Sequence, residues 1–221
     1  MCSNRGRVMS MLAPFQGSLL DQLAPVAEIG PLDGLVRRTR LNHGAWVDVL
    51  PGWVRGSDEV LWRLVAAVPW QAERRQMYER IVDVPRLLSF YAEGQPLPDP
   101  LLTAARGALN DHYRAELGED LVSAGLCYYR DGHDSVAWHG DTIGRSKTED
   151  TMVAIVSFGS PRKLLLRARR GRAKTLGFAL GHGDLLVMGG SCQRTWEHSI
   201  PKTMRPVGPR ISVQFRPRGV R

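Results

Sequence analysis

Hydrophobic and polar positions alternate in short runs along the C-terminal half of the chain. Gly, Pro and Asp separate these runs, and an alternation with a period of two is the pattern of strands with one buried face. We therefore predict strands at residues 121–130, 135–141, 151–158, 162–168, 174–180, 184–188, 194–199 and 210–216. Many short strands between turn signals are typical of a two-sheet jelly roll, and not of alternating helix and strand units.

Helical spacing is confined to the N-terminal half. Residues 35–54 alternate enough to be extended, and Ser57 then offers a helix cap before apolar positions that recur at helical spacing until Pro69. A second helix is predicted to begin at Asp99 and Pro100, a cap followed by proline at the first helical position. The fold class is accordingly α+β, mainly β, a jelly roll with supporting N-terminal helices.

Three segments follow from this pattern. Residues 1–35 have weak periodicity and several Pro and Gly breakers, so we expect a loosely attached N-terminal arm. Residues 36–120 should form the helical support, and residues 121–221 the jelly-roll core. We expect a single functional domain, which suits a chain of 221 residues.

Composition narrows the class of protein. With 43% hydrophobic residues the chain can bury a core, yet its apolar runs are too short for a bilayer and its start lacks a signal-peptide layout. Three cysteines at unrelated spacings form neither a disulfide framework nor a zinc-finger pattern. We expect a cytoplasmic monomer with reduced thiols and no membrane contact.

The formal net charge of +8 is unevenly placed. Residues 162–174 carry seven Lys and Arg with no acid among them, and the C-terminal tail is also rich in Arg. A clustered basic surface attracts polyanions, which favours contact with nucleic acid. A solvated hairpin with ordinary surface charge is the alternative.

One short motif carries candidate metal chemistry. His139 and Asp141 are two residues apart in a predicted strand, so their side chains should share a face, while Gly140 leaves the other face free. A second histidine, His198, lies in a later strand that a jelly roll can bring alongside. Two histidines and one carboxylate on one side of an octahedral metal are the arrangement of non-haem iron(II) oxygenases.

A second His-Gly-Asp tripeptide competes with the first. His182, Gly183 and Asp184 follow Gly181 and directly precede an apolar strand, so we interpret them as a turn and not as metal ligands.

The strand at residues 210–216 carries two arginines on one face. Arg210, Ser212, Gln214 and Arg216 alternate with apolar residues. Buried arginines need anionic partners, and a guanidinium suits a carboxylate, so the pair could hold the two ends of a short dicarboxylic acid. An edge strand whose arginines face water is an equal alternative.

Taken together, these residues resemble the AlkB family of iron(II) and 2-oxoglutarate dioxygenases, which remove alkyl groups from nucleic-acid bases. The resemblance covers residues 121–218 and has the family's order and spacing at these motifs: Tyr129-Arg130-Asp131-Gly132, His139-Gly140-Asp141, Val156-Ser157-Phe158-Gly159, Gly181-His182-Gly183-Asp184-Leu185, His198-Ser199-Ile200-Pro201 and the strand at 210–216. It implies a double-stranded β-helix, with Fe(II), 2-oxoglutarate and O2 as cofactor and cosubstrates.

The resemblance also implies site residues. His139, Asp141 and His198 would bind Fe(II), Arg210 and Arg216 would hold the two ends of 2-oxoglutarate, and Tyr129 would hydrogen-bond it. Ser212 would line the same site, although the family usually has asparagine at this position and at that of Cys127.

For the substrate, Val84, Pro85 and Arg86 with Phe90 and Tyr91 resemble the family's N-terminal substrate lid, so Phe90 and Tyr91 could stack on a base or be core aromatics. Arg170 or Arg172 could meet phosphate or base from the opposite side, or belong to a solvated loop.

The implied reaction is oxidative removal of N-alkyl groups from DNA or RNA bases, which releases succinate, CO2 and formaldehyde. Thr142 and Ile143 stand where the family has acidic base-contacting residues, which leaves open a dioxygenase that hydroxylates a small molecule or a protein side chain. A non-catalytic nucleic-acid-binding jelly roll, suggested by charge alone, is the third hypothesis.

Overall fold

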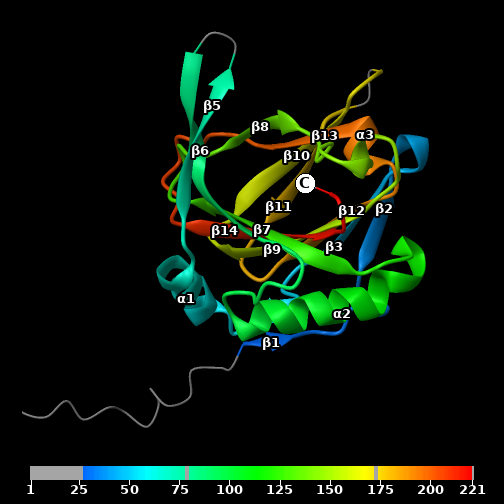
Figure 1. The fold of residues 1–221 in the computed structure, drawn as a ribbon, viewed down its shortest axis with the longest axis horizontal. Helices are drawn as coiled ribbons and strands as arrows, with labels where there is room; N and C mark the ends of the chain where they lie inside the picture. Colours follow the sequence, from blue (N-terminus) through cyan, green and yellow to red (C-terminus); the bar gives the residue numbers. More distant parts are fainter. Residues whose placement is uncertain (1–26, 78–79, 172–173, 221) are drawn as a thin grey trace, which may run out of the picture.

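The computed structural model of the chain describes residues 27–77, 80–171 and 174–220, with the side chains of residues 74–83 outside this description (Figure 1). Its largest element is an antiparallel sheet of eight strands. In spatial order the strands are β2 (Arg37–Arg40), β3 (Trp46–Leu50), β12 (Leu185–Gly189), β9 (Val153–Gly159), β14 (Arg210–Pro217), β7 (Leu121–Tyr129), β6 (Arg80–Tyr91) and β5 (Gln71–Met77).

A second, antiparallel sheet of four strands faces the first. Its order is β11 (Leu176–Leu180), β10 (Arg162–Ala168), β13 (Trp196–Ile200) and β8 (Val136–His139). The alternation of strand side chains divides the core into two layers, as β9 illustrates. Val153 and Ile155 pack between the sheets, whereas Val156 and Phe158 belong to the cluster on the opposite face. The predicted two-sheet jelly roll is confirmed.

Two helices cover the outer face of the large sheet (Figure 1). In α1 (Asp58–Ala67), the buried positions are Val60, Leu61 and Leu64, as the helical spacing predicts. The helix α2 (Pro100–Leu117) begins as predicted, because the Asp99 carboxylate accepts a hydrogen bond from the Leu101 N–H at 2.9 Å. Among the described residues, no helix combines the length and the apolar content needed to cross a lipid bilayer.

The remaining elements are short. They are β1 (Glu28–Ile29), β4 (Val54–Arg55), α3 (Cys192–Thr195) and 3-10 turns at Asn42–Gly44 and Arg145–Lys147. Residues 1–26 of the predicted arm lie outside the described residues. The part that follows is attached to the fold, because β1 pairs with β4 and Leu32 is buried.

The segment 36–120 is more than a helical support. It supplies β2, β3, β5 and β6 to the large sheet, and β6 pairs directly with β7 of the predicted core. The hairpin of β5 and β6 escaped prediction because β5 reads QAERRQM, in which no period-two apolar pattern is visible. This hairpin stands at the edge of the large sheet and contributes residues to the candidate site.

Candidate metal centre and its pocket

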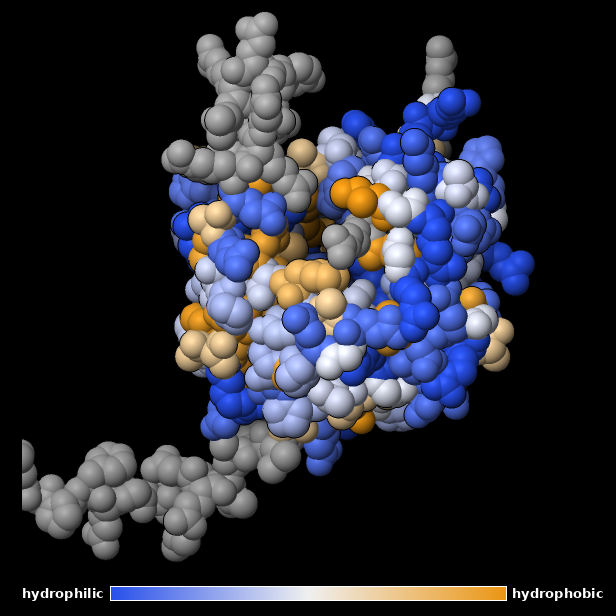
Figure 2. All heavy atoms as spheres, viewed as in Figure 1, coloured by the Kyte–Doolittle hydropathy of each residue, from blue (hydrophilic) through white to orange (hydrophobic). Residues whose placement is uncertain are grey.

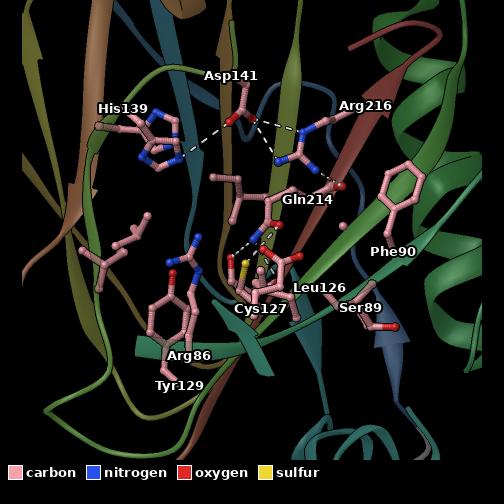
Figure 3. Close-up of a pocket in the computed structure, with 18 of the residues that line it drawn as sticks. Arg86, Ser89, Phe90, Leu126, Cys127, Tyr129, His139, Asp141, Gln214 and Arg216 are labelled. Atoms are coloured by element: carbon pink, nitrogen blue, oxygen red, sulfur yellow. Dashed lines mark hydrogen bonds and ion pairs between the residues drawn. The ribbon is translucent and has the colours of Figure 1, made fainter. Parts of the chain in front are cut away.

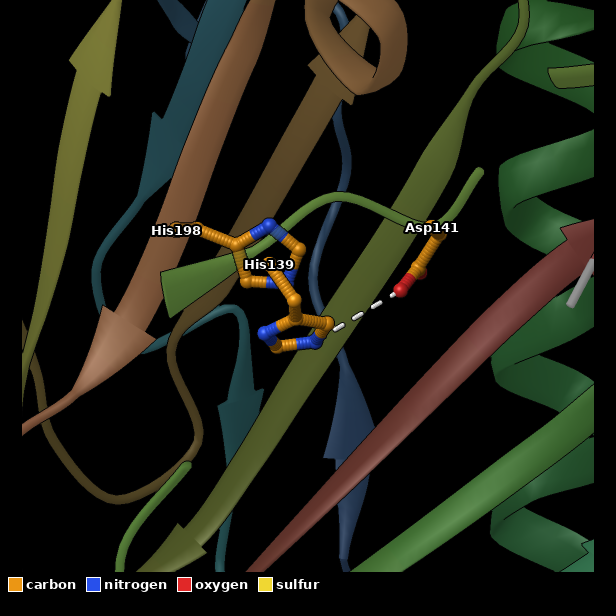
Figure 4. A group of neighbouring side chains, drawn as sticks. All are labelled: His139, Asp141 and His198. Carbon is orange, nitrogen blue, oxygen red and sulfur yellow. Dashed lines mark ion pairs between the residues drawn. The ribbon is translucent and has the colours of Figure 1, made fainter. Parts of the chain in front are cut away.

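The three predicted metal ligands meet at one place (Figure 4). In the antiparallel pairing of β13 with β8, His198 lies opposite His139, and their rings are 4.2 Å apart between centroids. The Asp141 Oδ1 atom is 3.7 Å from His139 Nε2. One ligand atom from each side chain lies within 4.8 Å of the other two, which is the spacing of donors around one cation.

The reason for this convergence differs from the predicted one. Residues 135–141 were predicted as one strand, but β8 ends at His139, and Gly140 and Asp141 follow it as irregular chain. At Gly140 a Cβ atom would come within 2.4 Å of the Gln193 carbonyl oxygen and 2.5 Å of the Arg169 guanidinium. Glycine is therefore needed for the close approach that turns Asp141 toward the two histidines.

Hydrogen bonds hold the ligands in orientation. His139 Nδ1 lies 2.8 Å from the Ala137 carbonyl oxygen. Because a carbonyl can only accept, Nδ1 carries the proton and Nε2 keeps its lone pair for a metal. The Asp141 N–H donates to Gln193 Oε1 at 3.1 Å, and the Ser146 hydroxyl donates to the Asp141 carbonyl oxygen.

The charge states suit a divalent metal. Burial disfavours the Asp141 carboxylate, but the charge and hydrogen bond of Arg216, together with the neighbouring His198 and His139, outweigh burial and lower the pKa of Asp141 to about 2. Burial, with the neighbouring His139, lowers the pKa of His198 to about 3, so its imidazole is neutral. Neutral imidazoles with an ionised carboxylate form the donor set that non-haem Fe(II) takes.

The ligands border a cavity of about 490 Å³ between the sheets (Figure 3). One wall is the inner face of the large sheet, where every second residue of β7 and β14 points inward. The register pairs these residues in successive rows: Arg210 with Tyr129, Ser212 with Cys127, Gln214 with Gly125, and Arg216 with Ser123. The two arginines thus stand at opposite ends of the wall.

Arg210 has an unfilled hydrogen-bonding position. Its side chain is buried, at 1% exposure, and its Nε donates to Ser157 Oγ at 2.9 Å. Its second nitrogen, NH1, has no partner among the described residues. A buried charged donor without an acceptor is costly, and a carboxylate would satisfy it. This end of the pocket therefore fits an organic acid such as 2-oxoglutarate.

Arg216 is engaged differently from the prediction. Its Nε and NH2 atoms donate to Asp141 Oδ2 at 3.1 and 3.0 Å. The predicted grip of Arg216 on the second carboxylate stays a prediction, whereas its contact with a metal-ligand carboxylate is a feature of the structure.

Tyr129 and Ser212, the other two residues predicted to contact the cosubstrate, also line the pocket. Burial raises the pKa of Tyr129 to about 12, so its hydroxyl remains a donor. The Ser212 hydroxyl accepts from Gln214 Nε2 at 2.6 Å, and Cys127 Sγ is 3.7 Å from Gln214 Oε1. The amide of Gln214 therefore occupies the space between the two positions where the AlkB-like pattern has asparagines.

Only one of the four residues predicted to contact the substrate lines the pocket in the described part of the chain. Phe90 lines the pocket and is 45% exposed. Tyr91 does not reach it, because neighbouring strand residues point to opposite faces and Tyr91 packs against the outer core layer. Arg170 is exposed and is not among the residues that line the pocket, and Arg172 lies outside the described residues.

The second His-Gly-Asp tripeptide is a turn, as predicted. His182 Nδ1 accepts from the Gly159 N–H at 2.8 Å, and its Nε2 lies 2.5 Å from Ser57 Oγ. The Asp184 carboxylate accepts from the backbone N–H groups of Gly181 and Gly52. These contacts tie the turn between β11 and β12 to the start of α1, away from the metal ligands.

Ile143, at a position where the family has an acid, and Arg86, in the lid-like segment, were not predicted as site residues, yet both line the pocket. Ile143, whose side chain is 65% exposed, lines the pocket beyond Asp141. Arg86 points into it from β6 (Figure 3). The signal for Arg86 was available, because a period of two places it on the same face as Leu88 and Phe90, but this region was not recognised as a strand.

The chain matches the family model of the 2OG-Fe(II) oxygenase superfamily over residues 63–216. This chain belongs to the 2OG-Fe(II) oxygenase superfamily. Fe(II), 2-oxoglutarate and O2 are thus its expected cofactor and cosubstrates, and its enzyme class is dioxygenase.

Relatives within the superfamily support the AlkB-like resemblance. The human alpha-ketoglutarate-dependent dioxygenase alkB homolog 3 is 28% identical over 190 residues, which cover 77% of this chain and 65% of that protein. The DNA oxidative demethylase ALKBH2 of Arabidopsis thaliana is 31% identical over 126 residues, covering 47% and 40%. The chain therefore spans less than two thirds of the length of these curated relatives.

Solved structures support the fold. OsALKBH1 aligns with a TM-score of 0.55 at 15% identity, covering 82% of this chain and 100% of that chain. A 2OG-Fe(II) oxygenase family oxidoreductase from Burkholderia pseudomallei also has a TM-score of 0.55, at 14% identity, with 79% and 86% coverage.

Proposed function

We propose that this dioxygenase oxidatively removes N-alkyl groups from nucleic-acid bases, with release of succinate, CO2 and formaldehyde. The observation that carries the proposal is the mouth of the pocket. Exposed apolar side chains, Phe90 and Ile143, line the same cavity as the three metal ligands. A flat base that is unstacked or already single-stranded could lie between them and present its alkyl group to the metal.

Within the pocket each residue has a proposed task. His139, Asp141 and His198 hold Fe(II), which together with 2-oxoglutarate and O2 supplies the oxidising chemistry. Arg210 binds the cosubstrate carboxylate, assisted by the hydroxyls of Tyr129 and Ser212. Arg216 keeps Asp141 ionised and oriented, and Phe90 and Ile143 position the base and restrict water.

Surface charge supports a polyanionic substrate. The Arg167 guanidinium of β10 lies 4.3 Å from the ring centroid of Trp138 in β8 and also pairs with Glu197 at 2.8 Å. Arg169 approaches the same carboxylate at 3.8 Å, so two arginines share one acid. Figure 2, viewed as Figure 1, shows a hollow bordered by hydrophobic side chains, with mostly hydrophilic surface beside it. We propose that these arginines, with Arg170, meet phosphates.

The names of two relatives support a nucleic-acid substrate, because the matched proteins of Arabidopsis thaliana and Homo sapiens are called DNA oxidative demethylase ALKBH2. The direct test measures formaldehyde released from oligonucleotides with N1-methyladenine or N3-methylcytosine, as DNA and as RNA. Release should require Fe(II) and 2-oxoglutarate, and should be lost in Asp141→Ala. If 2-oxoglutarate turns over but no methylated oligonucleotide is processed, the proposal fails and the enzyme class stands.

A second candidate rests on Ile143. An apolar side chain at the mouth, where the AlkB-like pattern places acids, suits a hydrophobic small molecule or a protein side chain as substrate. Such a substrate would be turned over at similar rates in low and moderate salt, unlike a nucleic acid.

The oligomeric state, the cellular location and the segment boundaries remain predictions. We expect a cytoplasmic monomer with one catalytic domain, and light scattering after size-exclusion chromatography tests the monomer directly.

A further inference from the structure

Arg86 extends the row of residues at the far end of the pocket. The register of β6 with β7 pairs Leu87 with Tyr128 and Leu88 with Cys127. One step further along this register brings Arg86 beside Tyr129, which is itself paired with Arg210 on β14. Arg86, Tyr129 and Arg210 therefore form one row across three neighbouring strands, and all three line the pocket.

Both arginines of this row have unsatisfied donors. Arg86 donates through NH1 to the Ser135 carbonyl oxygen at a long 3.2 Å, and its buried Nε has no partner among the described residues. The buried NH1 of Arg210 likewise has no hydrogen-bond partner among the described residues. Buried guanidinium nitrogens are normally hydrogen-bonded, so two such gaps on either side of one tyrosine indicate a missing acceptor.

Charge supports the same conclusion. Burial disfavours the charged form of Arg86, but Cys127 and Tyr129, with a smaller effect from Glu73, raise its pKa, so the guanidinium stays charged. The Asp141 carboxylate is already paired with Arg216. Two guanidinium groups on either side of Tyr129 repel each other, and an anion between them would remove that cost.

We propose that Arg86 is a second cosubstrate-binding arginine, which together with Arg210 holds the carboxylate of 2-oxoglutarate that lies farthest from the metal. The inference rests on the proposed role of Arg210. Because Cys127 and Ser212 replace the two amides of the AlkB-like pattern, a charged donor from β6 compensates for the lost hydrogen bonds. In Figure 3 the Arg86 guanidinium lies beside Tyr129 and is directed into the pocket.

The test compares two cosubstrates that differ only at this carboxylate. The dissociation constants of 2-oxoglutarate and of 2-oxovalerate, which lacks the distal carboxylate, are measured anaerobically from the Fe(II) charge-transfer band. We expect Arg86→Met to weaken 2-oxoglutarate binding about ten- to hundredfold, as for loss of a charge-assisted hydrogen bond. Binding of 2-oxovalerate should change less than about threefold, and Arg86→Lys should restore part of the loss.

Arg106→Met is the matched control, because Arg106 lies outside the pocket and likewise donates through NH1 to one backbone carbonyl, that of Val122, at 3.2 Å. It should leave both constants unchanged. A second assay needs no metal. It measures the rise in melting temperature that 2-oxoglutarate produces in the metal-free protein, and this rise should be smaller in Arg86→Met. If 2-oxovalerate binds too weakly for its dissociation constant to be measured, the melting-temperature assay tests the inference.

Equal weakening of both cosubstrates by Arg86→Met would assign Arg86 a structural role and overturn the inference. Unchanged 2-oxoglutarate binding would also overturn it. No nucleic acid enters this test, so its failure is distinct from failure of the proposed demethylase activity. An unchanged dissociation constant of 2-oxoglutarate in Arg210→Met would show that the cosubstrate site itself is wrongly assigned.

Discussion

Asp141 and Arg216 form the ion pair on which the metal centre depends. The carboxylate is 7% exposed, and Arg216 contacts one of its oxygens through two nitrogens, which leaves Oδ1 toward His139. A buried carboxylate that loses its partner becomes an uncompensated charge.

Arg216→Met should therefore lower the unfolding free energy of the metal-free protein by roughly 3 kcal/mol. A divalent cation would then compensate the bare carboxylate, so Zn²⁺ should raise the melting temperature of this variant by more than it raises that of the wild type. Urea denaturation and thermal melts measure the two effects. Wild-type stability in metal-free Arg216→Met would show that the pair contributes nothing.

The sequence predicted some residues of the site and not others. The triad was predictable because His139, Asp141 and His198 are rare residue types in a recognisable spacing. Arg86 was not assigned to the site, because the region around it was not recognised as a strand and its place in the pocket depends on the long-range pairing of β6 with β7. The pairing of Arg216 with Asp141 likewise follows from how β14 passes the end of β8.

Among the elements, α2 has a well-defined beginning. The Asp99 carboxylate caps the helix through the Leu101 N–H and also accepts from Arg63 Nε of α1 at 2.8 Å, so it ties the two helices together. Because Asp99 is 3% exposed, the cap is protected from water, whereas the Arg63 side chain of the second bond is half exposed.

Asp99→Ala should destabilise the protein by about 1–2 kcal/mol, the usual cost of a lost N-cap. Asp111→Ala, on the exposed surface of the same helix, is the control and should change stability by less than about 0.5 kcal/mol. Chemical denaturation measures both. Equal effects in the two variants would argue that the cap has no special contribution.

The turn between β7 and β8 depends on a buried carboxylate. Asp134 is 4% exposed and accepts from the Arg130 N–H at 2.8 Å, from its Nε at 2.8 Å and from its NH2 at 2.9 Å. Burial opposes ionisation, but the hydrogen bonds from Arg130, together with the charges of Arg130 and Arg162, outweigh burial and lower the pKa of Asp134 below its ordinary value of 3.8.

A lowered folded pKa stabilises the protein at pH values above the unfolded pKa, and this contribution is lost as pH falls through the folded pKa. Asp134→Asn should thus be less stable than wild type near neutral pH, and the difference should narrow below about pH 4. Urea midpoints at a series of pH values provide the measurement. A difference independent of pH would contradict an ionised Asp134.

The elements also show where sequence patterns suffice. Strands from β7 to β14 were predictable because nearly all of them alternate or are buried on both faces, and turn residues bound each one. The β5–β6 hairpin was missed because β5 is rich in charged residues, and the helical interpretation of 36–120 was incomplete for that reason.

At the scale of the whole molecule, the net charge of +8 makes a prediction about binding. If basic residues near the pocket meet phosphates, affinity for a methylated single-stranded oligonucleotide should fall at least about tenfold between 50 and 200 mM salt, as expected for three or more phosphate contacts. Fluorescence anisotropy at several salt concentrations gives the slope. A flat response would favour a small or protein substrate.

The architecture explains how one chain combines these features. The large sheet forms one wall of the pocket with β6, β7 and β14, and the small sheet brings His139 and His198 over it. The helices on the outer face hold the large sheet without entering the pocket.

The central claim, that His139, Asp141 and His198 bind one Fe(II) beside 2-oxoglutarate, is tested most directly by anaerobic titration with both ligands while the metal-to-ligand charge-transfer band is recorded. The band should appear in the wild type and in His133→Ala, whose histidine lies outside the pocket, and should be absent in His139→Ala. A wild type without the band, or a His139→Ala variant with the full band, would contradict the account.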